Sequence, residues 1–119
     1  MPYEHLGEDF AITEEQYGAV RRWVKENFIP IDSLNVDRSS ARLKRIFESR
    51  PDGFRVHEEI IRDVMVECGY RVRQSRSGQF FFNISEKSPA IRHWRQRVDE
   101  APNERRVWIW RGQREDGGA

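Results

Sequence analysis

The segment Tyr70–Ser85 constrains the fold more than any other part of the chain. Apolar and polar side chains alternate on either side of a turn at Arg76-Ser77-Gly78, which is typical of an antiparallel β-hairpin. The alternation predicts an inner face made of Tyr70, Val72, Phe80, Phe82 and Ile84. It predicts an outer face made of Arg71, Arg73, Phe81 and Asn83.

Four helices are indicated around this hairpin. The first begins at Thr13, where Gln16 completes a capping box, and ends before Ile29-Pro30. The second is capped by Asp37 or Ser39 and ends before the turn at residues 51–53. The third covers about residues 57–68, with Gly69 at the position of a C-terminal glycine. The fourth opens at Ser88-Pro89, a capping serine followed by a proline in the first helical position.

The strands outside the hairpin are less regular. Val107–Trp110 alternates as a strand, residues 54–56 form a very short strand, and residues 30–38 form a connection. The predicted fold is α+β and winged-helix-like, with four helices and a small antiparallel sheet made of the hairpin and the C-terminal strand. We expect a single domain over residues 1–119, with an N-terminal arm at 1–11 and a disordered tail at 112–119.

Composition narrows the class of protein. Cys68 is the single cysteine, so no intramolecular disulfide can form. Charged residues make up 34% and aromatic residues 12%, which favours an aromatic core beneath a heavily charged surface. No apolar run approaches the ~20 residues of a membrane span. The acidic N-terminus lacks the pattern of a signal peptide, so the expectation is a cytoplasmic protein without membrane contact.

Charge is distributed unevenly along the chain. The net charge of +1 combines an acidic segment at residues 1–20 with a block at residues 71–98 that holds seven bases and one acid. Arginine side chains suit phosphates, and release of condensed counterions drives such association. The block therefore predicts contact with a nucleic-acid backbone, with Phe81 placed to stack on a base. The expected contacts are Arg71, Arg73, Arg76, Arg92, Arg95 and Arg97.

A protein-interaction module is the alternative. The third helix carries an acidic outer face made of Glu58, Glu59, Asp63 and Glu67, which would repel phosphates in a major groove and suits a basic protein. In the C-terminal strand, Trp108 and Trp110 alternate with Val107 and Ile109, so both faces are apolar. That strand is either covered on both sides or presents a patch to a partner or a second copy, which leaves monomer and homodimer open.

Catalytic and metal-binding patterns are not found in the sequence. His5, His57 and His93 lie far apart, and Cys68 lies on an apolar helix stripe, where a packed thiol is expected. No glycine-rich phosphate loop occurs. The expectation is therefore a non-enzymatic protein without a cofactor or a metal.

The stretch from Ser39 to Ser85 resembles small bacterial and phage-borne accessory proteins of unassigned activity. The residues that carry the resemblance are Ser40, Leu43-Lys44, Glu48, Gly53-Phe54, Ile60, Met65, Gly69-Tyr70 and Phe82-Asn83-Ile84-Ser85. The resemblance implies no activity of its own. It implies an accessory protein of a phage, plasmid or similar element, such as a regulator or inhibitor of a host or defence protein.

Overall fold

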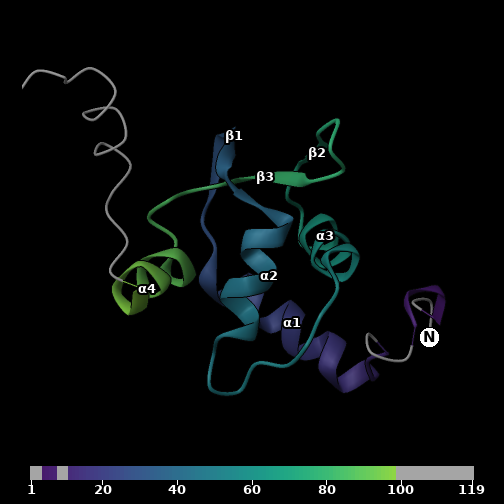
Figure 1. Cartoon of the computed structure of the whole chain (residues 1–119). Helices are drawn as coiled ribbons and strands as arrows, with labels where there is room; N and C mark the ends of the chain where they lie inside the picture. The colour runs from purple at the N-terminus through teal and green to yellow at the C-terminus, as the bar shows by residue number, and fades with distance from the viewer. Residues whose placement is uncertain (1–3, 8–10, 99–119) are drawn as a thin grey trace, which may run out of the picture.

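The computed structural model describes residues 4–7 and 11–98 of the chain. Along these residues the elements are η1 (Glu4–Leu6), α1 (Glu14–Asn27), β1 (Pro30–Ser39), α2 (Ser40–Glu48), α3 (Glu58–Glu67), β2 (Val72–Gln74), β3 (Phe80–Ile84) and α4 (Pro89–Val98) (Figure 1). The fold is α+β, as predicted, with α-helices arranged around a small antiparallel sheet.

The predicted caps of the first two helices are confirmed. The Thr13 hydroxyl accepts a hydrogen bond from the Gln16 amide at 3.0 Å, and the Gln16 side chain accepts one from the Thr13 amide at 2.9 Å. This reciprocal pair satisfies two amides that the first turn of α1 leaves without helical partners. Ser39, rather than Asp37, caps α2, and His57 caps α3.

Two glycines define how the chain leaves α3 and turns in the hairpin. Gly69 follows α3 with a φ of +95°, and Gly78 lies in the hairpin turn with a φ of +92°. Residues with a Cβ rarely adopt this left-handed region, so both turns require glycine. The turn between β2 and β3 is closed by the hydrogen bond from the Ser75 amide to the Gln79 carbonyl, 2.8 Å long.

The sheet has the strand order β1-β3-β2 and is antiparallel throughout. Its third strand is β1, so the prediction of a connection at residues 30–38 was wrong. The predicted C-terminal strand, with Trp108 and Trp110, and the predicted tail at 112–119 lie outside the described residues. Residues 54–56, predicted as a short strand, are not assigned to a strand.

Strand β1 was not predicted because its pairing with β3 is irregular. Pro30 lies opposite Ile84 and Ser39 lies opposite Phe81, so ten residues of β1 span only four of β3, with register shifts between the paired positions. Such bulges remove the two-residue alternation on which strand prediction depends. Accordingly, the first four residues of β1 are all exposed.

The core lies between the helices and the inner face of β3. Trp23 of α1 contacts Phe28 and Phe47 edge to face, with ring centroids 5.0 Å and 5.1 Å apart. Phe82 and Ile84 of β3 are fully buried, as predicted, whereas Val72 of β2 is 38% exposed, contrary to its predicted inward position. Val72 lies on the short outer strand of the sheet, where less of the helical layer covers it.

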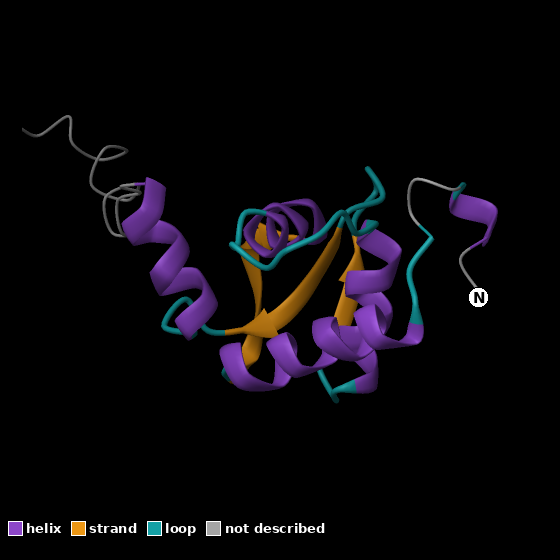
Figure 2. Cartoon of the chain, turned by 90° about the horizontal axis from the view of Figure 1, so that it is seen from below, coloured by secondary structure: helices purple, strands orange, loops and turns teal. Residues whose placement is uncertain are grey.

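The hairpin and α4 lie at opposite ends of the molecule. Figures 1 and 2 both show β3 running away from the hairpin turn toward α4, which packs against α2. Strand β2 instead packs against β3 and α3. None of the helices within residues 4–7 and 11–98 is long and apolar enough to cross a membrane.

Gly53 offers a test of the turn between α2 and α3. A Cβ at Gly53 would lie 2.3 Å from the carbonyl oxygen of Phe47, so Gly53→Ala should lower the free energy of unfolding by about 1–3 kcal/mol. The matched control is Gly18→Ala in the middle of α1, where the nearest atom to the new Cβ is 3.9 Å away. That control should raise stability by about 0.5–1 kcal/mol, because alanine favours the helix. Urea unfolding measures both, and equal effects of the two substitutions would contradict this account.

Candidate functional site

The hairpin presents its arginines to solvent. Val72, Arg73 and Gln74 of β2 lie opposite Phe82, Phe81 and Phe80 of β3, so Arg73 shares the outer face with Phe81 as predicted. Arg73 and Arg76 are exposed, and neither forms an ion pair within the described residues. The hairpin between Gly69 and Ser85 contains no acidic residue at all.

Arg71 is held in place at the base of the hairpin. Its backbone amide donates to the Oδ1 of Asn83 at 2.7 Å, and its guanidinium donates to the carbonyl oxygen of Asp32. The Nδ2 of Asn83 donates to the carbonyl oxygen of Ile31 at 3.0 Å. The Asn83 amide therefore joins β1 to the hairpin, and Arg71 serves partly as a structural contact.

Phe81 is only partly available as a stacking platform. It lies on the outer face opposite Arg73, but its side chain is half-buried, and the neighbouring Asn83 is buried. A base that stacks on an aromatic ring needs an open face of that ring. The hairpin arginines are thus the more accessible part of the predicted contact surface.

The basic block of residues 71–98 divides into separate parts. Arg92 and Arg97 are exposed on α4, at the far end of β3 from the hairpin (Figure 1). Arg95, predicted to face solvent, turns inward instead, and its guanidinium binds the carboxylate of Glu86. The six predicted arginines therefore do not form one continuous surface.

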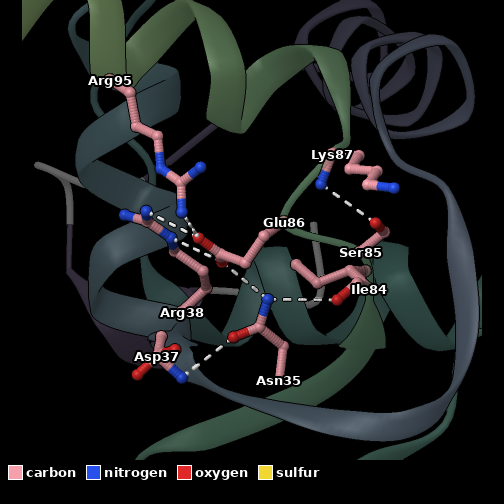
Figure 3. Close-up of polar contacts among 8 residues, drawn as sticks. All are labelled: Asn35, Asp37, Arg38, Ile84, Ser85, Glu86, Lys87 and Arg95. Carbon is pink, nitrogen blue, oxygen red and sulfur yellow. Dashed lines mark hydrogen bonds and ion pairs between the residues drawn. The ribbon is translucent and has the colours of Figure 1, made fainter. Parts of the chain in front are cut away.

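An interior polar cluster surrounds Glu86 (Figure 3). The guanidinium of Arg38 donates twice to the Glu86 carboxylate, through Nε to Oε2 at 2.9 Å and Nη2 to Oε1 at 3.0 Å. The Nδ2 of Asn35 donates to the same Oε2 at 2.8 Å and to the carbonyl oxygen of Ile84 at 3.1 Å. Together with Arg95, these contacts tie β1 and α4 to the loop between β3 and α4.

Glu86 supplies a carboxylate that pairs with both Arg38 and Arg95 in this cluster. Arg38 is only 1% exposed, and a buried charge is tolerated when it is paired and hydrogen-bonded. Burial by itself raises the pKa of the Glu86 carboxyl, but the hydrogen bonds from Arg38 and Asn35 and the charges of Arg38 and Arg95 outweigh it. The pKa of Glu86 is therefore lower than its ordinary value.

Sequence reasoning did not single out this cluster. One signal pointed toward it, because Glu86 is the single acid among seven bases in residues 71–98. A lone acid within a basic block is a natural internal partner for arginines. Arg38, the other arginine that binds Glu86, is distant in sequence and lies in the stretch predicted as a connection. No local sequence pattern therefore indicates this pair.

The acidic face of α3 is partly compensated by neighbouring bases. Glu67 binds Arg21 of α1 at 3.1 Å, and Asp63 binds Arg62 at 2.7 Å. Glu59 binds His5 of η1 at 3.2 Å. The fourth predicted acid, Glu58, accepts a hydrogen bond from the buried Ser40 hydroxyl at 2.9 Å. Two of the four acids are thus paired with arginines, and the acidic surface that remains is smaller than the sequence suggests.

His57 and Cys68, which could in principle take part in chemistry, both have roles in the fold. The Nδ1 of His57 accepts a hydrogen bond from the Glu59 amide at 3.1 Å, as the cap of α3. Burial raises the pKa of the Cys68 thiol, which disfavours the reactive thiolate. Within residues 4–7 and 11–98, no group of three or more histidine, cysteine or carboxylate side chains is placed to hold a metal ion.

In comparisons with known proteins, no family model, no curated protein and no solved structure matches this chain. The functional interpretation therefore rests on the geometry of its own residues.

The Glu86 cluster leads to a pH-dependent prediction. Glu86→Gln should lower the free energy of unfolding at pH 7 by about 3 kcal/mol, because the buried Arg38 loses its charged partner. The folded-state pKa of Glu86 lies below the ordinary value of 4.5, so the ionised carboxylate stabilises the fold above that value. This stabilisation is lost as the pH falls through the lowered pKa. Urea unfolding of the unmodified protein and of Glu86→Gln is measured between pH 7 and pH 3. The difference between their free energies of unfolding should become smaller as the pH falls.

The matched control is Glu67→Gln, which removes a carboxylate from an exposed ion pair with Arg21. Exposed pairs contribute about 0–1 kcal/mol, so this variant should stay close to the unmodified protein. A difference for Glu86→Gln that is as small as that of the control would contradict the role assigned to the cluster. So would a large difference that persists unchanged to pH 3.

Proposed function

We propose that this domain is a non-enzymatic module that binds nucleic acid through phosphate contacts made by the β2–β3 hairpin. One observation carries the proposal: the hairpin projects from the sheet edge with exposed Arg73 and Arg76, and residues 69–85 contain no acid. Guanidinium groups present planar, permanently charged donors to phosphate oxygens. Neutralising phosphates releases condensed counterions, which favours association at low salt.

The order of the elements supports a winged-helix-like interpretation. Helix α1, strand β1, helices α2 and α3, and strands β2 and β3 follow one another, with β3 between β1 and β2 in the sheet. In this interpretation the β2–β3 hairpin is the wing, and α3 occupies the place of a recognition helix. We assign the phosphate contacts to the wing, because α3 carries four acids against the single Arg62 and provides no positive surface.

Helix α4 is not needed for these contacts. Its exposed Arg92 and Arg97 lie at the other end of β3, and its Arg95 is bound to Glu86. Whether α4 also contacts the nucleic-acid backbone is tested with a separate variant of α4.

The test compares three double variants of equal charge change. Arg73→Gln with Arg76→Gln alters the hairpin, and Arg92→Gln with Arg97→Gln alters α4. Arg22→Gln with Lys25→Gln alters two exposed bases of α1 and is the control. Binding to duplex and single-stranded DNA and RNA is measured by fluorescence anisotropy over a range of salt concentrations.

The hairpin variant should bind more weakly to duplex DNA. Its slope of log affinity against log salt should become shallower by about 0.9 for each phosphate that the variant no longer neutralises. The control should keep the slope of the unmodified protein. Absence of binding at low salt, or a hairpin variant that behaves like the control, would overturn the proposal. A shallower slope for the α4 variant would show that α4 also contacts the backbone.

A protein-interaction module is the second proposal, in keeping with a regulator or inhibitor of another protein. One observation favours it: the edge strand β1 exposes apolar side chains, with Val36 exposed by 71% and Ile31 by 37%. An edge strand with exposed apolar side chains is suited to pairing with a strand of another chain.

The version in which the partner is a second copy is tested by light scattering. The mass should rise from 14.3 kDa toward twice that value as the protein concentration increases. Val36→Lys should keep the mass near 14.3 kDa, because an edge lysine opposes strand pairing. A constant monomer mass for both proteins would remove the homodimer and leave only a different protein as the partner.

A further inference from the structure

A small cavity lies between α1, the turn after α2, and α4. Its volume is about 220 Å³, and its lining includes the buried side chains of Trp23, Ile46 and Ala90. Arg50, His93 and Arg97 line it together with Asp52. Because α4 is at the far end of β3 from the hairpin, this cavity is separate from the proposed nucleic-acid surface (Figure 1).

Both arginines of the cavity are held against aromatic rings. The Cζ of Arg50 lies 5.9 Å from the ring centroid of Trp23 and 5.3 Å from that of Phe47. The Cζ of Arg97 lies 5.7 Å from the ring centroid of Trp94. A guanidinium stacked on a ring keeps the donors along its edge available and loses little freedom when it binds a ligand. Both positive groups are therefore ordered before any ligand arrives.

The donors around the cavity are only partly used. Arg97 donates through Nη2 to the Ser49 hydroxyl at 3.0 Å, and Arg50 is paired at 3.2 Å with Asp52, whose side chain is 76% exposed. Asp52 is the single acidic side chain in the cavity lining, against two arginines and a histidine. The cavity lining is thus positive, and Asp52 is the one carboxylate in it that competes with a bound anion for Arg50.

Size and charge together select the class of ligand. A cavity of about 220 Å³ is smaller than the ~300–1,000 Å³ of drug-sized ligand pockets, so it suits a small group. A phosphate group presents acceptor oxygens in several directions and can use guanidinium donors from α4 and from the turn after α2 simultaneously. We propose that this cavity binds a phosphate group, with Arg50 and Arg97 as its principal partners and His93 beside them.

A neighbouring hollow indicates where the rest of a phosphate ester would lie. It has a volume of about 200 Å³ and shares Trp23, Arg50 and Asp52 with the first cavity. Phe47 and Phe54 also line it. The recognised phosphate group could therefore come from free phosphate or from a small aromatic phosphate ester. The experiment described next distinguishes these two sources.

The experiment titrates the full chain with inorganic phosphate, adenosine monophosphate and adenosine, followed by amide and indole signals in NMR spectra. Phosphate and the monophosphate should shift the signals of residues 50–53 and 93–97, and adenosine should shift none of them. Tighter binding of the monophosphate than of phosphate would identify an ester as the preferred source. Equal affinity would identify free phosphate as sufficient, and binding of all three probes alike would overturn the proposal.

Two substitutions with opposite expected signs sharpen the test. Arg97→Gln should weaken phosphate binding about tenfold, the equivalent of one charge-assisted hydrogen bond. Asp52→Asn should strengthen it several-fold, because the competing carboxylate is removed from Arg50. Asp52 is largely exposed, so this variant is expected to stay folded, and thermal unfolding checks every variant.

The matched control for Arg97→Gln is Arg92→Gln, an exposed arginine of the same helix that does not line the cavity. It should bind phosphate as the unmodified protein does, and so should the hairpin variant Arg73→Gln with Arg76→Gln. Equal weakening by Arg97→Gln and Arg92→Gln would mean non-specific attraction to a basic helix and would overturn the site. Because the hairpin variant is altered only at the nucleic-acid surface, failure of one proposal is distinguishable from failure of the other.

Discussion

The carboxylate of Glu86 is the contact on which the arrangement of the other elements depends. It accepts hydrogen bonds from Arg38 and Asn35 of β1 and from Arg95 of α4, while Glu86 itself lies in the loop that leaves β3. Arg38 is buried, so its charge needs this partner inside the fold. The contact fixes β1 as the third strand and sets the position of α4. Through α4 it also places His93 and Arg97 beside Arg50, where they line one cavity.

Glu86 also determines which charges reach the surface. Residues 71–98 hold one acid and seven bases, and that acid is used inside the molecule by Arg38 and Arg95. The exposed arginines of the hairpin and of α4 therefore have no acidic neighbour within this block. A sequence with a net charge of +1 thus folds into a molecule with exposed arginines on the hairpin and on α4, at the two ends of β3. Local charge of this kind governs the encounter with charged ligands, whatever the total.

Features set by neighbouring residues were predictable from the sequence, and features set by distant contacts were not. The capping box at Thr13, the glycine after α3 and the hairpin around Gly78 follow from local rules, and all three are confirmed. Strand β1 was missed because its bulges remove the alternation and its stability comes from Asn35, Arg38 and β3. Arg95 was placed outside because it is charged, although it lies four residues after the buried Ile91 on the same helix face. The Glu86 carboxylate that lets it face inward is a tertiary contact. Arg73 and Arg76 of the hairpin stay exposed because no carboxylate pairs with them among the described residues.

The acids of α3 show how ion pairs change the charge of a surface, which composition alone describes poorly. Three of them are matched with Arg21, Arg62 and His5, which come from α1, α3 and η1. Pairs of this exposure add little to stability, because solvent screens them and the side chains lose freedom. The two arginine–carboxylate pairs also weaken the electric field of α3, because the fields of two opposite charges about 3 Å apart largely cancel at a distance. Helix α3 still carries four acids against the single Arg62, so it stays net negative, whereas the hairpin has exposed arginines and no acid. If a polyanion binds this domain, as we propose, this contrast favours the hairpin over α3.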